Sequence, residues 1–360
     1  MARQLTPRLG RFGLDQGQGY LTAFPAQSSV LDEEVLLSRV VKLYDVPQPT
    51  GCSFYCRGDA DVYRIHTRGR FYYLKVYRPE YSPAHVESEG RLVTDLARCG
   101  VPVVPPVPLA AGGFAHAVDA PEGTRSMLLL EQAPHGTVSE LDEAFSERLG
   151  ASLARLHAVA DRLTNDYRLP ATDATTFDSL LPYAQTVLGD DDYHLLRTVA
   201  DRIRPKLAGL ADKPPDHGLC HCDLVRSNIR VREDGEIVFF DFGGAGFCWR
   251  AYELAVARSM LEQAVDRNAV QCWDALLAGY ARVRPAPVGL SEAMPYMLLT
   301  RNIGWVAGNA ATLPLRLGRQ QFEQGVMAKA VGRVREIADG IPESAGLTAR
   351  VAVPGEKEDV

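Results

Sequence analysis

Hydrophobic residues in the first third of the chain follow a helical period in some stretches and a strand period in others. Across residues 30–43 the apolar positions recur at steps of three and four with acidic residues near the start, which predicts an amphipathic helix. Residues 61–65 and 71–77 are rich in aromatic and β-branched residues around a Gly-containing turn, which predicts a β-hairpin. A helix over 85–99 and a short buried strand over 126–131 follow. This part of the chain is therefore predicted to combine an antiparallel sheet with helices.

The helical period dominates beyond residue 140. It predicts helices over 145–159, 177–188, 193–210, 252–262, 273–280 and 290–311. Two short apolar strands are predicted at 229–231 and 237–240, on either side of the turn residues 233–235. The second part of the chain is thus expected to be mainly helical.

Length and turn chemistry divide the chain into lobes. A chain of 360 residues suffices for two domains at about 100–200 residues each. The Pro- and Gly-containing turn at 132–137 marks the boundary between them. We predict a loose N-terminal tail at 1–28, an N-terminal lobe at 29–133, a helical C-terminal lobe at 134–340 and a disordered tail at 341–360.

Composition excludes several classes of function. The net charge of −6, without clustered Lys and Arg, argues against bulk nucleic-acid binding. The sequence has no apolar run of about 18 residues, so a membrane-spanning helix is not expected. Seven cysteines without regular disulfide spacing favour a reducing, cytoplasmic location. No feature of the sequence indicates an oligomeric state.

The candidate chemistry lies in residues 218–243. Asp223 and Asn228 stand in one predicted loop, and Asp241 ends the apolar strand that follows, so the three side chains can surround one volume. Phosphoryl transfer needs a carboxylate that orients and deprotonates an attacking hydroxyl, and oxygen ligands that hold magnesium on the phosphates. Asp223 is therefore the candidate base, and Asn228 and Asp241 are the candidate Mg²⁺ ligands.

The pattern His221-x-Asp223 with Asn228, followed by Asp241-Phe-Gly243, resembles the catalytic and metal loops of the protein-kinase-like superfamily. Within it, the sequence is most similar to the aminoglycoside phosphotransferase family, which includes choline and homoserine kinases. The resemblance implies an α+β, protein-kinase-like two-lobed fold with an antiparallel-sheet N-terminal lobe and a mainly helical C-terminal lobe. It also implies ATP and Mg²⁺ as cofactors and a small-molecule hydroxyl compound as the phosphate acceptor.

The same resemblance assigns the nucleotide-binding residues. Lys75 corresponds to the strand lysine that contacts the α and β phosphates, and Glu89 to its ion-pair partner, with Glu87 as a nearby rival. The residues at 129–133 resemble the hinge between the lobes. There, the Glu131 carbonyl and the Ala133 N–H would pair with adenine.

Further residues have supporting roles by the same likeness. The turn that contains Ser53 and Gly58 would cover the phosphates, although it lacks a full glycine motif. His221 is expected to position the catalytic loop and Glu253 to brace it. Arg226 either stabilises the transferring charge or is a solvated loop residue, and the sequence leaves both open.

Two positions depart from the family pattern. Cys222 stands where many relatives have Gly, so we predict that its backbone is not left-handed. Gly244 follows Asp-Phe-Gly243 directly, and many small-molecule kinases have a second acidic residue at this position or at the next one. Both departures keep open a pseudokinase-like nucleotide-binding regulator as an alternative function.

A second alternative is a protein Ser/Thr kinase of the bacterial stress-response type, which the segment 75–80 and the literal Asp-Phe-Gly resemble. Against it, the Tyr252-Glu-Leu-Ala segment follows Gly243 too closely to leave room for an activation segment.

The presumed acceptor region has a mixed charge: Glu292 and Glu323 are set against Arg301, Arg316 and Arg319. This balance does not favour a polycationic acceptor. An acceptor that carries an anionic group is at least as compatible with these residues, and the sequence does not choose between the two.

Overall fold

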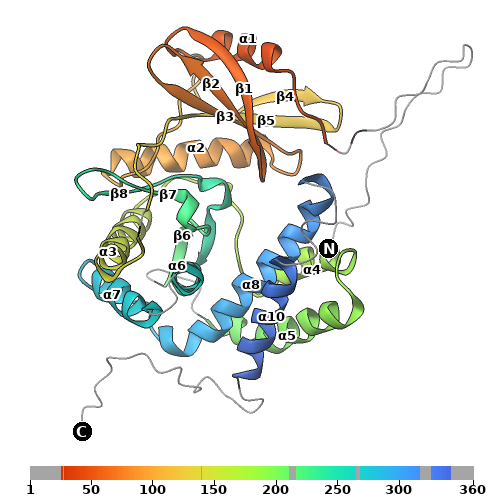
Figure 1. The fold of residues 1–360 in the computed structure, drawn as a ribbon, viewed down its shortest axis with the longest axis vertical. Helices are drawn as coiled ribbons and strands as arrows, with labels where there is room; N and C mark the ends of the chain where they lie inside the picture. Colours follow the sequence, from red (N-terminus) through yellow and green to blue (C-terminus); the bar gives the residue numbers. More distant parts are fainter. Residues whose placement is uncertain are drawn as a thin grey trace, which may run out of the picture.

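The structure is a computed structural model that describes residues 26, 28–138, 140–210, 216–264, 268–316 and 326–341. The predicted tails at 1–28 and 341–360 lie almost entirely outside these ranges. Within them the chain forms a sheet-containing N-terminal lobe above a mainly helical C-terminal lobe (Figure 1). The protein has the kinase-like fold that was predicted. In the part of the chain that the structure describes, no helix has the length and hydrophobicity needed to cross a membrane.

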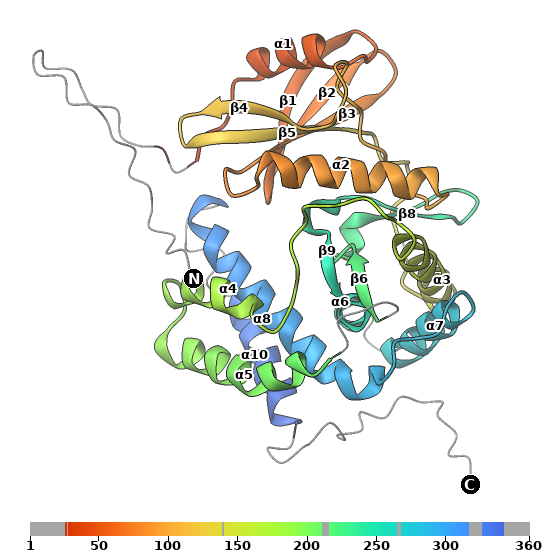
Figure 2. The same ribbon diagram turned by 180° about the vertical axis from the view of Figure 1, so that it is seen from behind.

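The N-terminal lobe is an antiparallel sheet of five strands in the order β1-β2-β3-β5-β4. Its strands are β1 (Pro49–Arg57), β2 (Ala60–Thr67), β3 (Phe71–Tyr77), β4 (His116–Ala120) and β5 (Gly123–Glu131). Helix α1 (Glu33–Leu43) covers one face of the sheet, and α2 (Pro83–Arg98) lies on the other face, toward the C-terminal lobe (Figure 2). The sheet therefore has one face packed on α1 and one face directed at the junction of the lobes.

The segment before β2 differs from the prediction. Residues 53–61 were expected to form a phosphate-covering turn, whereas β1 continues as a strand to Arg57 and pairs with β2. The turn is confined to the tip, where the N–H of Gly58 donates to the Ala60 carbonyl at 2.9 Å. The alternation in β1 was hidden because most of its residues are small, polar or exposed.

The C-terminal lobe contains helices and two small β-ribbons. The helices are α3 (Glu143–Ala160), α4 (Thr176–Gln185), α5 (Asp190–Ala208), α6 (Arg250–Ala264), α7 (Ala269–Ala281), α8 (Leu290–Arg316) and α10 (Val326–Asp339). The ribbons pair β6 (His217–Cys220) with β9 (Gly246–Trp249), and β7 (Ile229–Val231) with β8 (Ile237–Phe239). Helix α10 and strands β6 and β9 were not predicted, because each is short or only partly apolar.

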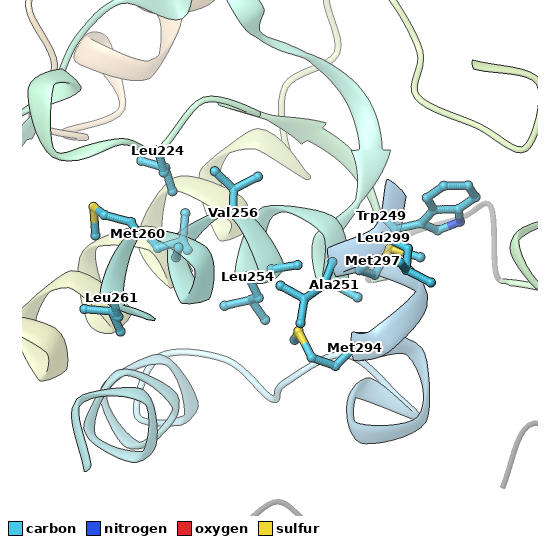
Figure 3. Packing of buried hydrophobic residues seen from close by; sticks show 14 of the residues in the cluster. Leu224, Trp249, Ala251, Leu254, Val256, Met260, Leu261, Met294, Met297 and Leu299 are labelled. Carbon is cyan, nitrogen blue, oxygen red and sulfur yellow. The ribbon is translucent and has the colours of Figure 1, made fainter. Parts of the chain in front are cut away.

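The core of the C-terminal lobe is centred on α6. Figure 3 shows the α6 side chains Leu254 and Val256 between Leu224 of the catalytic loop and Met294 of α8. Each of these four residues is buried, with at most 2% of its surface exposed. Burial of a side chain of this size contributes about 1.5–3 kcal/mol, so the catalytic loop is fixed by the same core that holds α8.

Helices α3 and α7 approach closely at two glycines. A Cβ atom at Gly150 would collide with the Leu276 carbonyl, and one at Gly279 would collide with the Glu147 carbonyl. The absence of side chains at both positions lets the two backbones meet. This contact brings Tyr280, next to Gly279, against α3.

Candidate active site

Strand β3 presents Lys75 toward the interior of the protein. Successive strand residues point to opposite faces, and Leu74 packs in the cluster on the α1 side, so Lys75 points toward α2. Its Nζ lies 3.4 Å from Glu89 Oε1 and 2.7 Å from Asp241 Oδ1. Because Asp241 belongs to the C-terminal lobe, this pair of contacts connects the two lobes.

Tyr77 completes the ion-pair network. Its hydroxyl accepts from Lys75 Nζ at 2.9 Å and donates to Glu89 Oε2 at 2.5 Å. Burial alone would lower the pKa of Lys75, but the charges of Asp241 and Glu89 outweigh it and hold that pKa well above its usual value. Tyr77 was not predicted as a site residue. Its position two residues after Lys75, on the same face of the strand, is the signal that could have identified it.

Glu89, rather than Glu87, faces Lys75. Glu87 instead accepts from the backbone N–H groups of Phe114 at 2.7 Å and Ala115 at 2.9 Å. The two glutamates, two residues apart on α2, therefore have different roles: Glu87 holds the loop before β4, and Glu89 is 1% exposed beside Lys75.

Asp241 follows β8 in a left-handed conformation, with φ at +65°. This conformation is uncommon for a residue with a side chain, and it turns the carboxylate toward Lys75. The Lys75 ammonium group lowers the pKa of Asp241 below its usual value. Gly243 permits the approach, because a Cβ at this position would lie 3.2 Å from Lys75 Nζ.

The catalytic loop holds Asp223 and Asn228 together. Asn228 Nδ2 donates to the Asp223 carbonyl at 3.0 Å and to Asp223 Oδ2 at 2.9 Å. These contacts leave Asp223 Oδ1 available to a substrate. Asp223 is accessible to solvent, but protein surrounds it on most sides, and this desolvation raises the pKa of its carboxyl.

His221 positions this loop through both of its ring nitrogens. Its Nε2 lies 3.0 Å from the Phe240 carbonyl, and its Nδ1 lies 3.3 Å from the backbone N–H of Asp223. A carbonyl can only accept and an N–H can only donate, so the geometry requires the tautomer with hydrogen on Nε2. His221 therefore links the catalytic loop to the end of β8.

Glu253 braces the loop from α6. Its Oε2 accepts from the N–H of His221 and its Oε1 from the N–H of Cys222, both at 2.8 Å. His157 on α3 lies 3.1 Å from Glu253 Oε2, and its other ring nitrogen lies 2.8 Å from the Tyr280 hydroxyl. Glu253 and His157 are both 0% exposed, so this is a buried network without direct access to substrate.

The prediction for Cys222 is wrong. Its φ is +64°, so a residue with a side chain occupies the left-handed conformation that Gly usually takes. The bond from its N–H to Glu253 fixes this geometry, and its Sγ lies 3.4 Å from Cys248 Sγ on β9. Tertiary contacts thus impose a conformation that the local sequence disfavours.

Gly244 lies directly beside the candidate base. A Cβ at Gly244 would be 3.5 Å from Asp223 Cβ. An acidic side chain here would therefore begin in contact with Asp223, and glycine leaves that side of Asp223 open.

The predicted hinge and phosphate-covering residues lie on the sheet side of the junction. Glu131 ends β5, its N–H donates to the Pro105 carbonyl at 3.1 Å, and Ala133 follows in the connection to the C-terminal lobe. Ser53 on β1 pairs with Arg64 on β2, and Arg64 pairs with Tyr73 on β3. Ser53 therefore lies on the same face of the sheet as Tyr73 and Lys75. Gly58 is farther along, at the tip of the hairpin.

Arg226 contacts the connection between the lobes. Its Nε and Nη2 both donate to the Val138 carbonyl, at 3.0 and 2.5 Å. The contact ties the catalytic loop to the chain just after the hinge.

The residues at this site fit a magnesium ion. Asn228 uses its Nδ2 to hold Asp223, so its Oδ1 is the atom that can face a cation, and Asp241 uses Oδ1 on Lys75 and retains Oδ2. Carboxylate and amide oxygens are the ligands that Mg²⁺ prefers, together with phosphate oxygens and water.

Comparison with known sequences places the site within a family. The model of a phosphotransferase enzyme family matches residues 57–286. An uncharacterised protein of Deinococcus radiodurans is 34% identical over 313 residues, which cover 84% of this chain and 91% of that protein. An uncharacterised protein of Synechocystis is 29% identical over 301 residues, covering 81% and 82%. The family match contains every site residue named above except Ser53, and it ends before α8.

Solved structures share the fold. An amicoumacin kinase in complex with AMP-PNP and Ca²⁺ superposes with a TM-score of 0.72 at 22% identity, over 87% of this chain and 95% of that one. A microcompartment-associated aminopropanol kinase gives 0.67 at 20% identity, over 85% and 95%. A spectinomycin phosphotransferase bound to ADP and spectinomycin gives 0.58 at 13% identity, over 86% and 98%.

Proposed function

The chain belongs to the phosphotransferase enzyme family, and from this we propose that it is an ATP- and Mg²⁺-dependent kinase that phosphorylates a hydroxyl group of a small molecule. The observation that carries the proposal is the contact of Lys75 with both Glu89 and Asp241, at 3.4 and 2.7 Å. A buried lysine held between a helix glutamate and a metal-ligand candidate is the arrangement that phosphoryl transfer from a nucleotide requires.

Asp223 would accept the proton of the acceptor hydroxyl at its Oδ1, since Oδ2 is occupied by Asn228. Its raised pKa makes it a stronger base than an ordinary aspartate. His221 and Glu253 fix the loop, so the carboxylate does not have to reorganise during the reaction.

Lys75 would contact the α and β phosphates, with Glu89 and Tyr77 fixing its ammonium group. Asn228 and Asp241 would hold Mg²⁺, which neutralises negative charge on the phosphates when bound. The Glu131 carbonyl and the Ala133 N–H would pair with adenine at the start of the lobe connection.

The test is the variant Asp223→Asn, assayed by ADP formation with ATP, Mg²⁺ and a panel of hydroxyl compounds. We expect kcat to fall by about 10²- to 10⁴-fold, because the general base is lost. The dissociation constant of AMP-PNP should stay within about twofold of wild type, because Asp223 is not assigned to the nucleotide. Omission of Mg²⁺ should abolish turnover. Asp234→Asn, in the exposed turn between β7 and β8, is the matched control.

Retained turnover in Asp223→Asn would contradict the assignment of the base. Wild-type protein that binds AMP-PNP but forms no ADP with any acceptor would instead support the nucleotide-binding regulator. The protein-kinase alternative is disfavoured, because the short β9 and then α6 at Arg250 follow the 3₁₀ turn Phe242–Gly244 directly and leave no length for an activation segment.

A further inference from the structure

Arg301, in the middle of α8, is partly buried and differs from the fully buried arginines of this protein. Arg125 is paired with Asp61 at 2.9 Å, and Arg250 with Asp161 at 2.6 Å. Arg301 forms no hydrogen bond or ion pair with any residue that the structure describes, and its Nε is buried without a partner. A cation in such a place is costly, because desolvation is not compensated by an opposite charge.

The guanidinium group of Arg301 is within electrostatic range of the candidate base Asp223. Helix α8 packs against α6, and the charge of Arg301 acts on Tyr252 of α6 and on Asp223. Burial lowers the pKa of Arg301, and its positive charge in turn favours the ionised form of Asp223. No ion pair within 4.0 Å joins Arg301 to Asp223 among the described residues, and Asn228 occupies only Oδ2 of Asp223, so Oδ1 is left for the acceptor hydroxyl.

The face of α8 that carries Arg301 has room for a ligand. Gly304 and Gly308 follow at three and seven residues, which places them on the same face of the helix as Arg301. Apart from the chain neighbours and the nearby backbone of α8 itself, no atom of the described residues lies within 4 Å of a Cβ placed on either glycine. Trp305, four residues after Arg301, is only partly buried beside this space. Open space next to an unpaired guanidinium group is the arrangement of an anion-binding subsite.

We infer that Arg301 binds an anionic group of the acceptor, a carboxylate or a phosphate, while Asp223 receives the acceptor hydroxyl. The planar guanidinium fork matches either anion with two parallel hydrogen bonds. The acceptor class is thus a hydroxy acid or a hydroxyl compound that carries a phosphate. The inference rests on the proposed kinase function and restricts its acceptor. Of the other charged residues in this region, Arg316, Arg319 and Glu323 have no side chains that the structure describes and play no part in it; Glu292 lies in the first turn of α8, nine residues before Arg301.

The first measurement is binding, and it requires no turnover. Protein loaded with AMP-PNP and Mg²⁺ is titrated calorimetrically with two matched probe pairs, glycerate against glyceramide and glycerol 3-phosphate against glycerol. In wild type, we expect the anionic member of at least one pair to bind about tenfold more tightly than its neutral partner, a difference of about 1.4 kcal/mol. Arg301→Gln should lose this preference. Arg301→Lys, which keeps the charge but not the fork, should keep part of it.

Two further measurements separate this role from a structural or nucleotide role. The Tm of Arg301→Gln should equal or exceed that of wild type, because an uncompensated buried charge is removed. The AMP-PNP dissociation constant should be unchanged. Arg335→Gln, which removes a half-exposed charge on α10 in the same lobe, should behave as wild type in every assay.

Three results would overturn the inference. The first is the absence of an anion preference in wild type for both probe pairs. The second is a Tm that falls by several degrees in both Arg301→Gln and Arg301→Lys, which would mean that Arg301 has a structural role. The third is weaker AMP-PNP binding with unchanged probe binding, which would place the guanidinium group on the nucleotide phosphate. Failure of the proposed function appears separately, as wild-type protein that binds AMP-PNP but forms no ADP with any acceptor.

Discussion

The nucleotide side and the acceptor side of the proposed active site differ in whether their charged residues are paired. On the nucleotide side, Lys75 is already paired with Glu89 and Asp241. On the acceptor side, Arg301 has no partner among the described residues, and Gly304 leaves open space beside it. The paired side lies within the range matched by the family model, whereas α8 lies outside it. If the proposed roles hold, the fold preorganises the nucleotide side, which lies within the family match, and leaves the acceptor side unpaired.

The largest expected effect comes from removing the ammonium group of Lys75, which pairs with Glu89 and Asp241. Lys75→Met should lower kcat/KM for ATP by about 10²- to 10³-fold, because a preorganised positive charge at the phosphates is lost. It also leaves Glu89 buried without its cation. Initial rates over a range of ATP concentrations measure the effect. Lys42→Met, in the last turn of α1, is the surface control. If Lys75→Met retained wild-type kcat/KM, the paired side would not be the nucleotide side.

The next prediction concerns the loop that both sides share. Glu253 accepts from the backbone N–H groups of His221 and Cys222 with its two carboxylate oxygens. In Glu253→Gln an amide N–H replaces one of these oxygens and faces a backbone N–H, so that one hydrogen bond is lost. We expect the free energy of unfolding to fall by about 1–3 kcal/mol. Misplacement of Asp223 should reduce kcat by up to about 100-fold. Urea unfolding and ADP formation measure the two effects. Glu262→Gln, on the same helix but partly exposed, should cost less than about 1 kcal/mol. Equal losses in the two variants would show that the buried brace has no special role.

A smaller effect is expected from removing the Tyr77 hydroxyl, which contacts both Lys75 and Glu89. Tyr77→Phe removes the hydroxyl between Lys75 and Glu89 and should cost about 1–2 kcal/mol of stability, with a rise in the KM for ATP. Tyr72→Phe is the matched control, because Tyr72 lies on the opposite face of β3 and its hydroxyl has no hydrogen bond among the described residues. A KM for ATP that rose equally in both variants would show that the Tyr77 hydroxyl does not position Lys75.

The smallest effect concerns the backbone next to Asp223. Cys222→Gly should raise the free energy of unfolding by about 0.5 kcal/mol, because release of the left-handed strain slightly exceeds the entropic cost of glycine. Cys222→Ala keeps the strain and should show no gain. Thermal or urea unfolding of the two variants makes the comparison. A gain in both variants would attribute the effect to loss of the thiol and not to backbone strain.

The nucleotide side was the easier side to predict from the sequence. The hydrophobic pattern placed Lys75 on a strand and Glu89 on a helix, and the family resemblance paired the two. Residues 71–77 form β3 with the bounds that were predicted. Glu87 and Glu89 could not be separated in this way, because both lie on α2 and differ only in which neighbour they meet. The loop before β4 contacts the first, and Lys75 contacts the second.

Residues 221–223 show where local rules fail. The sequence favoured an ordinary conformation for Cys222, since a side chain disfavours positive φ. Glu253, from a helix about thirty residues later, accepts two successive N–H groups of the loop and thereby selects the left-handed conformation. Backbone propensity at one position is worth about 1–2 kcal/mol, and two buried hydrogen bonds to a carboxylate exceed it.

By itself, the sequence determined the class of fold, the order of the motifs and the identity of Asp223, Asn228 and Asp241 as one candidate site, because residue type and period are local properties. The tertiary structure alone decided which charges are paired. Lys75 contacts two carboxylates, whereas Arg301 contacts none among the residues that the structure describes. This difference depends on how β3, α2, β8 and α8 are placed in space. The charge of the acceptor region was ambiguous in the sequence for the same reason: a count of charged residues does not show which of them are already neutralised by a neighbour.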